Sequence, residues 1–457
     1  MKRASGVLLH LTSLWGDYGS GSLGKAAFEW IDFLAESGFS YWQVLPVCLP
    51  DRESHSPYKS PAAFACNERL IDLDDLYQSG LLTKDDLESA KQASPYACEF
   101  DRDRLSLLTL ASSRADKKTR DEVLSFCESH PEIDAACRFL AKTDEDLFAR
   151  RFIETTFYRQ WEEMHRYAAK KGVKLIGDIP FYVAPDSADV AAHPEQFQLD
   201  KDGRLSAVAG VPPDYFAPKG QLWGNPLYDF DEMKRDGFTW WRARLRAMFD
   251  LFDGVRIDHF RAVESYYRLP ADAEDAIHGE WVAGPREDFV QMLKEEAGDK
   301  LIIAEDLGDI TKEVAELVKR SGFPGMRVFQ FGFDSPHSIH RIHNYPANCV
   351  CYSGTHDNNT LLGFLFELDE RTRAEALAYV GARGIDDGCV RIVAALLGSH
   401  ADLCVLPVQD LLRYGVDTRM NVPGRAEGNW GYRVTKEQVN SLDRGYYRAL
   451  NEQYGRL

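Results

Sequence analysis

The chain has 457 residues, of which 44% are hydrophobic and 28% charged, proportions that are ordinary for a soluble globular protein. Acidic residues outnumber basic ones, 72 to 54, and the net charge of -18 repels phosphate backbones. The nine cysteines are scattered without a Cys-x-x-Cys pair. The N-terminus lacks a signal-peptide core, and no stretch approaches the roughly 20 apolar residues of a membrane span. We therefore expect a cytoplasmic protein that has no nucleic-acid or membrane partner.

Short apolar runs alternate with helical patterns along most of the chain. In the first unit, a strand at 6–11 precedes a helix with Phe28, Ile31 and Leu34 on one face, and a strand at 41–47 follows. Further strands are expected at 174–183, within 251–263, and at 301–308, 326–333, 348–357 and 402–408. Helices are expected around 240–252 and 288–297, after a cap at Asp309 or Thr311, and around 390–397. Eight parallel strands with helices between them predict a closed (β/α)8 barrel, a TIM barrel of the α/β class.

A doubly wound open sheet is the rival fold, but no glycine-rich phosphate-binding turn follows any of these strands. Two insertions interrupt the alternation. Residues 48–150 contain a loop and a charged, mainly helical region, and residues 184–240 are rich in proline, glycine and aromatic residues. Both insertions follow a strand, so we expect both on the C-terminal face of a single catalytic barrel spanning residues 1–457.

Four acidic residues stand where barrel strands are expected to end: Asp178, Asp258, Glu305 and Asp357. Polar residues at the C-terminal ends of barrel strands converge on one pocket. Arg256 precedes Asp258 by two residues, so both side chains point to the same face of their strand, where the guanidinium keeps the carboxylate ionised. Taken alone, such a pair fits a structural ion pair as well as a catalytic one.

A divalent metal is one interpretation of this cluster, since His259 and His356 stand beside two of the acidic residues. Arg256 already supplies the positive charge, so we expect no metal and no other cofactor. Glycoside chemistry fits better, because it needs an ionised carboxylate as nucleophile and a protonated carboxyl as acid. Asp258 suits the first role. Glu305, after an apolar run that should raise its pKa, suits the second, and the histidines suit sugar hydroxyls.

Eight stretches, in order along the chain, carry a family resemblance: SGVLLHLTSLWGDYGSGSLG, SPYKSPAAFACNERLIDL, GDIPFYVAPDSADV, VAGVPPDYFAPKGQLWGNPLYD, DGVRIDHFRAV, IIAEDLG, SGTHDNNT and RMNVPGRAEGNW. They run from Ser5 to Trp430. Together they resemble the amylomaltases, or 4-α-glucanotransferases, of the α-amylase clan, which include the plant disproportionating enzymes. Departures from the family's usual residues occur at Leu11, Trp15, Lys59 and Asn359.

The resemblance implies transfer of α-1,4-glucan segments between maltooligosaccharides, with glucose as a further acceptor, by a retaining double displacement. Asp258 would attack the anomeric carbon, Glu305 would act as acid and then as base, and Asp357 would stabilise the oxocarbenium-like state. The stretch 210–228 would form a lid over the bound glucan. The residues implied to contact the sugar are Tyr58, Asp178, Gln221, Trp223, Arg256, His259, His356 and Asn421.

Two aromatic residues of the implied lid, Phe216 and Tyr228, are expected to pack rather than to bind sugar. An α-glucan hydrolase of the same clan is the close alternative, since it differs only in whether water or sugar accepts the glycosyl group. A non-catalytic glucan-binding barrel is the alternative from another class, and its mark would be a missing carboxylate. The protein is expected to be a monomer or a homodimer.

Overall fold

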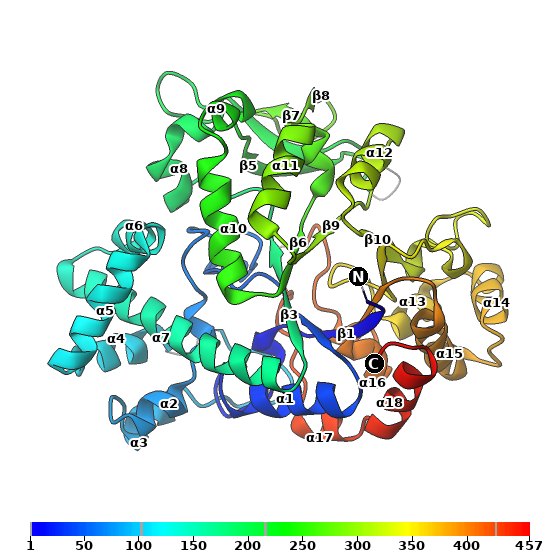
Figure 1. Cartoon of the computed structure of the whole chain (residues 1–457), viewed down its shortest axis with the longest axis horizontal. Helices are drawn as coiled ribbons and strands as arrows, with labels where there is room; N and C mark the ends of the chain where they lie inside the picture. Colours follow the sequence, from blue (N-terminus) through cyan, green and yellow to red (C-terminus); the bar gives the residue numbers. More distant parts are fainter. Residues whose placement is uncertain (1, 101–103, 214–216, 426) are drawn as a thin grey trace.

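Eight parallel strands close into a barrel in the computed structural model, which describes residues 2–100, 104–213, 217–425 and 427–457 (Figure 1). The strand order around the barrel is β1-β12-β11-β10-β9-β6-β3-β2. The strands are β1 (Ala4–Leu8), β2 (Tyr41–Gln43), β3 (Lys174–Ile179), β6 (Gly254–Ile257), β9 (Leu301–Ala304), β10 (Gly325–Val328), β11 (Cys349–Tyr352) and β12 (Leu403–Pro407). Each overlaps an expected strand, so the predicted (β/α)8 barrel is confirmed.

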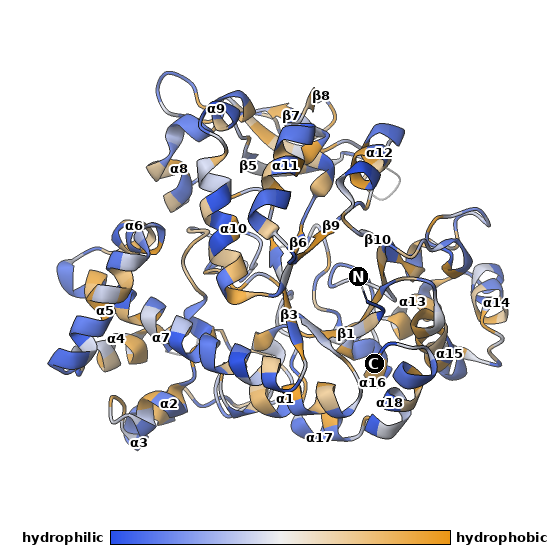
Figure 2. Cartoon of the chain, viewed as in Figure 1, coloured by the Kyte–Doolittle hydropathy of each residue, from blue (hydrophilic) through white to orange (hydrophobic). Residues whose placement is uncertain are grey.

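Helices surround the barrel and pack their apolar sides against it (Figure 2). The helices between barrel strands include α1 (Lys25–Glu36), α7 (Asp144–Lys170), α10 (Thr239–Leu251), α11 (Arg286–Ala297), α12 (Lys312–Ser321) and α15 (Ile385–Gly398). Thr311, not Asp309, caps α12, because its side chain accepts the N–H of Val314. Only the 3-10 turns η5 (Phe329–Phe331) and η6 (Ile342–Asn344) lie in the described stretch between β10 and β11, so strict alternation fails there.

The first insertion leads from β2 toward the long helix α7. It carries α2 (Leu73–Gln78), α3 (Lys84–Glu88), α4 (Arg104–Ser113), α5 (Lys117–Ser129) and α6 (Pro131–Leu140). Helices α4, α5 and α6 pack on α7 at one side of the molecule (Figure 1). The loop before α2 stays close to the barrel and brings Tyr58 to its mouth, where the Tyr58 hydroxyl bonds to Asp178 on β3.

A second, antiparallel sheet in the order β5-β4-β7-β8 was missed by the sequence analysis. Its strands are β4 (Ala207–Val211), β5 (Gln221–Pro226), β7 (Ser265–Pro270) and β8 (Glu280–Ala283). In Figure 1 this sheet lies with α8 (Ala188–Ala192) and α9 (Phe230–Arg235) at one end of the molecule. Residues 221–226, which belong to the stretch expected to form a lid, are therefore a strand. The reason is that β4 pairs on both sides, with β5 and with the distant β7.

Within the described residues, no helix combines the length and the apolar composition that a membrane crossing needs.

Candidate active site

Asp258 and Arg256 form a charged cluster with Asp178 across two paired strands. Asp178 on β3 lies opposite Arg256 on β6. Nη1 of Arg256 donates to both carboxylate oxygens of Asp178 at 2.8 Å, and Nη2 lies 2.8 Å from Oδ1 of Asp258. Burial opposes the charge on Arg256, but the two carboxylates outweigh it and raise the pKa of the guanidinium well above its ordinary value. The side chain of Asp258 is 30% exposed, against 5% for Arg256, so a substrate can reach Asp258.

Glu305 follows β9, the strand that pairs with β6 on its other side. Its carboxylate accepts the backbone N–H of His259 at 2.7 Å and that of Leu307 at 2.9 Å. Burial, reinforced by the charge of Asp258, raises the pKa of Glu305 to about 8, although Arg256 and the two amides act in the opposite direction. Glu305 therefore holds a proton at neutral pH, and the amides are in place to stabilise its anion.

His259 has a strained backbone, with φ 48° and ψ 46° in the left-handed region. Such a conformation costs a non-glycine residue about 1 to 3 kcal/mol, and here it points the His259 amide at Glu305. Burial lowers the pKa of the His259 ring to about 4 against the opposing charge of Asp258, so the imidazole is neutral. Nε2 of His259 is buried without a hydrogen-bond partner among the described residues.

Trp223 and Gln221 lie on β5, in the second sheet. The Trp223 ring meets the His259 ring edge to face, with 4.7 Å between centroids, and is 37% exposed. Nε1 of Trp223 donates to Oε1 of Gln221 at 3.2 Å. Tyr228 is fully buried and donates its hydroxyl to the carbonyl of Phe181 at 2.7 Å, so its predicted packing role is confirmed. Phe216 lies outside the described residues.

Asp357 follows β11, on the other side of the barrel mouth. Asn421 donates its Nδ2 hydrogen to Oδ1 of Asp357 at 2.6 Å, and Nε2 of His356 lies 3.3 Å from the same oxygen. Nη2 of Arg419 donates to the backbone carbonyl of Asp357 at 2.7 Å. The carboxylate is therefore held in one orientation while much of its surface stays open to solvent.

Tyr58 links the two sides of the site. Its hydroxyl donates to Oδ2 of Asp178 at 2.7 Å. Its ring stacks on His356, with 5.0 Å between centroids and 8° between planes, and lies 5.7 Å from the Trp430 ring. Burial, together with the charge of Asp178, raises the pKa of Tyr58 well above its ordinary value, so the hydroxyl keeps its proton and remains a donor.

Two residues of this site escaped the sequence analysis. Arg419 and Trp430 lie in the motif that also contains Asn421, and a full reading of that motif could have suggested both. Their roles depend on contacts across the barrel mouth, which spacing along the chain does not show. Among the residues that the structure describes, no group of three His, Cys, Asp or Glu side chains is arranged to hold a metal ion.

Comparisons with known proteins agree over the full length of the chain. A family model described as 4-alpha-glucanotransferase matches residues 9–147 and 129–439. A 4-alpha-glucanotransferase of Streptococcus pneumoniae serotype 4 is 38% identical over 498 residues, covering 99% of this chain and 98% of the relative. One from Thermus thermophilus is 38% identical over 499 residues, covering 100% of both proteins. The solved structure of amylomaltase from Streptococcus agalactiae in complex with acarbose is 33% identical, with a TM-score of 0.95 and 100% coverage of both chains. The chain belongs to the 4-α-glucanotransferase family.

Proposed function

We propose that this chain transfers α-1,4-glucan segments from a donor maltooligosaccharide to the 4-hydroxyl of an acceptor glucan or glucose, with retention at the anomeric carbon. One observation carries the proposal: three carboxyl groups in three different environments meet at the mouth of the barrel. Asp258 is partly exposed and salt-bridged, Glu305 is buried and protonated, and Asp357 is partly exposed and oriented by Asn421. Retaining glycoside chemistry needs a nucleophile and an acid–base group of this kind.

In the first step, an oxygen of the Asp258 carboxylate attacks the anomeric carbon of the donor. The glycosidic C–O bond breaks as Glu305 gives its proton to the leaving oxygen, and a glycosyl ester on Asp258 remains. The amides of His259 and Leu307 then stabilise the new Glu305 anion. Arg256, held by Asp178, keeps the Asp258 carboxylate oriented for the attack.

In the second step, the acceptor's 4-hydroxyl attacks the same carbon from the side that the leaving group vacated. Glu305 takes the hydroxyl proton, and the ester bond to Asp258 breaks, which restores both carboxyl groups. Positive charge develops on the sugar ring in each step. Asp357, fixed by Asn421 and His356, supplies the negative charge that stabilises it.

The second sheet favours a sugar over water as the acceptor. On β5, the Trp223 ring meets the ring of His259, the residue after Asp258, and Gln221 accepts a hydrogen bond from Trp223. A glucan bound beneath β5, in the part of the chain expected to form a lid, would lose contact with water, and the ester would wait for an acceptor that gains binding energy at its own subsites. The position of the Trp223 ring beside His259 is the feature that favours a transferase over a hydrolase.

Product analysis tests the proposal. Maltotriose with glucose should yield a ladder of longer and shorter oligosaccharides without a matching rise in reducing ends, whereas a hydrolase would raise them. Asp258→Asn should abolish transfer and hydrolysis while the thermal unfolding midpoint stays near that of the parent. A fluorinated glucosyl donor should label Asp258, and a label on another carboxylate would refute its role. A non-catalytic barrel would turn over none of these substrates.

The cellular setting is also proposed. All nine cysteines are free, as in a reducing cytoplasm, and the acidic surface suits a protein with neither nucleic acid nor membrane as partner. We propose a monomer or a homodimer, which the molar mass measured by light scattering would test.

A further inference from the structure

Cys48 and Cys66 face each other at the base of the loop 49–65, where they form an isolated antiparallel bridge. Two backbone hydrogen bonds of 2.8 Å flank the pair, one from the N–H of Leu49 to the carbonyl of Ala65 and one from the N–H of Asn67 to that of Val47. This pattern identifies a non-hydrogen-bonded pair, in which opposite Cα atoms lie about 4.5 Å apart and both side chains leave on the same face. A disulfide spans Cα atoms that are about 4.4 to 6.8 Å apart, so the backbone at this pair has the spacing for one.

Both cysteine side chains line one small cavity, of about 30 Å³, between the bridge and the helices α7 and α10. The thiol of Cys48 donates to the carbonyl of Pro57 at 3.4 Å, and the backbone N–H of Cys66 donates to the carboxyl of Glu154 at 3.0 Å. Cys48 is partly exposed, whereas Cys66 is buried. A small reagent from solvent therefore meets Cys48 first, and Cys66 can reach the Cys48 sulfur through the cavity that they share.

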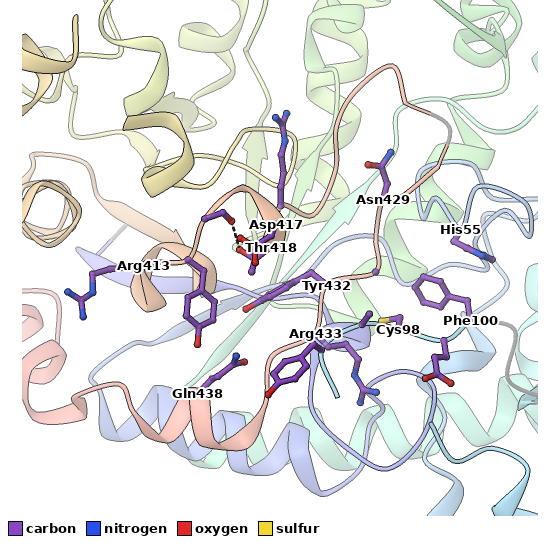
Figure 3. A pocket seen from close by; sticks show the side chains of 18 residues that line it. His55, Cys98, Phe100, Arg413, Asp417, Thr418, Asn429, Tyr432, Arg433 and Gln438 are labelled. Carbon is purple, nitrogen blue, oxygen red and sulfur yellow. Dashed lines mark hydrogen bonds between the residues drawn. The ribbon is translucent and has the colours of Figure 1, made fainter. Parts of the chain in front are cut away.

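The loop between the two cysteines carries Tyr58, which joins the two sides of the active site through its hydroxyl and its ring. Pro57, whose carbonyl accepts the Cys48 thiol, directly precedes Tyr58. Elsewhere the loop is held by His55, whose ring lies 4.6 Å from the ring of Phe100 at one wall of the large cavity in Figure 3. The chemical state of Cys48 is therefore one residue removed from the position of Tyr58.

We propose that Cys48 and Cys66 are a redox modification site, at which a low-molecular-weight disulfide oxidises the two thiols to a disulfide that closes the base of the loop 49–65. The thiolate of Cys48 attacks one sulfur of the oxidant, whose S–S bond breaks, and the first half leaves as a thiol. Cys66 then attacks the Cys48 sulfur of this mixed disulfide, and the second half leaves as a thiol. The protein loses two electrons and two protons, and the oxidant gains both.

Oxidation removes the thiol hydrogen that Cys48 donates to Pro57. Tyr58 then loses a neighbouring support, so glucan binding weakens; this consequence rests on the glucanotransferase function given above. Burial raises the pKa of the Cys48 thiol, and burial together with the charge of Glu154 raises the pKa of Cys66 well above its ordinary value. Both thiols keep their protons at neutral pH, so the disulfide forms slowly and forms faster as the pH rises.

The test exposes the full chain to glutathione buffers of rising oxidised-to-reduced ratio. A peptide map made without reduction should then contain a fragment that joins Cys48 to Cys66. Cys351 and Cys404 face each other on β11 and β12 but are fully buried, so they should stay unlinked. The oxidised chain should have a kcat/KM for maltotriose that is about two- to tenfold lower, the scale of one lost hydrogen bond, mainly through a higher KM. Dithiothreitol should restore the parent value.

Two variants separate this site from general oxidation. Cys66→Ala should keep the parent activity when reduced and should not respond to the oxidant. Cys98→Ala is the matched control and should respond as the parent does, because Cys98 is also partly exposed but has Gly431 opposite, to whose carbonyl its N–H donates at 2.8 Å.

Three outcomes would overturn the inference: a glutathione adduct on Cys48 without the linkage, a linkage of Cys351 to Cys404 that forms as readily, or a linkage of Cys48 to Cys66 that leaves kcat/KM unchanged. If the reduced chain does not turn over maltotriose, the proposed function falls, while the peptide map still decides whether the disulfide forms.

Discussion

Replacing Trp223 with alanine should raise the ratio of hydrolysis to transfer. The ring stands beside His259, which follows the proposed nucleophile Asp258 in the chain, and its exposed part is free to cover a bound sugar. The contact with His259 is worth about 0.5 to 1.5 kcal/mol, and a ring face on a desolvated sugar adds to it. The total loss is on the order of 1 to 3 kcal/mol, which is roughly a 5- to 150-fold slower transfer. Hydrolysis should fall less, because a water molecule can attack the glycosyl ester without binding in an acceptor site that this ring covers.

The assay follows maltotriose consumption and the release of reducing ends in the same reaction. Leu222→Ala is the matched control. Leu222 is the preceding residue on β5 and is 39% exposed, but it points to the opposite face of the sheet. Leu222→Ala should keep the ratio of hydrolysis to transfer that the parent chain has. If Trp223→Ala lowers both activities equally and leaves the ratio unchanged, β5 is only a structural flap and the water-exclusion argument is wrong.

Three further predictions concern metal independence, the proton of Glu305 and the buried carboxyl of Glu154. Activity should survive dialysis against a chelator, because Arg256 provides the positive charge beside Asp258; loss with EDTA that calcium or magnesium restores would contradict this. The kcat/KM for maltotriose should fall as the pH rises through about 8, where Glu305 loses its proton, whereas a maltosyl fluoride donor, which needs no acid, should lack this fall. Burial raises the pKa of Glu154 from 4.5 to about 8. Its contribution to stability is therefore full below about pH 4.5 and is lost as the pH rises through 8, so the Tm of the parent chain should fall over this range. Glu154→Gln should flatten this fall in Tm.

The barrel could be predicted from the sequence because each of its strands is a short apolar run that needs no partner to be recognised. Asp258 and Glu305 were also visible, since a charged residue directly after such a run interrupts the core pattern. Burial of Glu305 then raises its pKa, as the apolar run Leu301–Ala304 indicated. The local sequence pattern therefore predicted both the barrel fold and the upward shift of the Glu305 pKa.

The second sheet was missed for the opposite reason. Strands β7 and β8 are short and carry polar residues such as Arg268 and Glu280, so neither has a core pattern of its own. Their stability comes from pairing with each other and with β4, which is more than fifty residues away along the chain. Pairing of this kind depends on tertiary structure, and a single sequence does not display it. The same limit hid the contact of Trp430 with Tyr58.

The strand order also explains why no single motif contains the active site. Strands β3, β6 and β9 are neighbours, so Asp178, Asp258 and Glu305 form one wall of the barrel mouth. Strand β10 separates β9 from β11, so Asp357 enters from a different direction, with Asn421 behind it. A sugar ring bound between these walls would meet Asp258, the proposed nucleophile, on one side and Asp357, the proposed stabilising carboxylate, on another. That arrangement suits a transition state whose charge is spread over the ring, because negative groups can approach it from two directions at once.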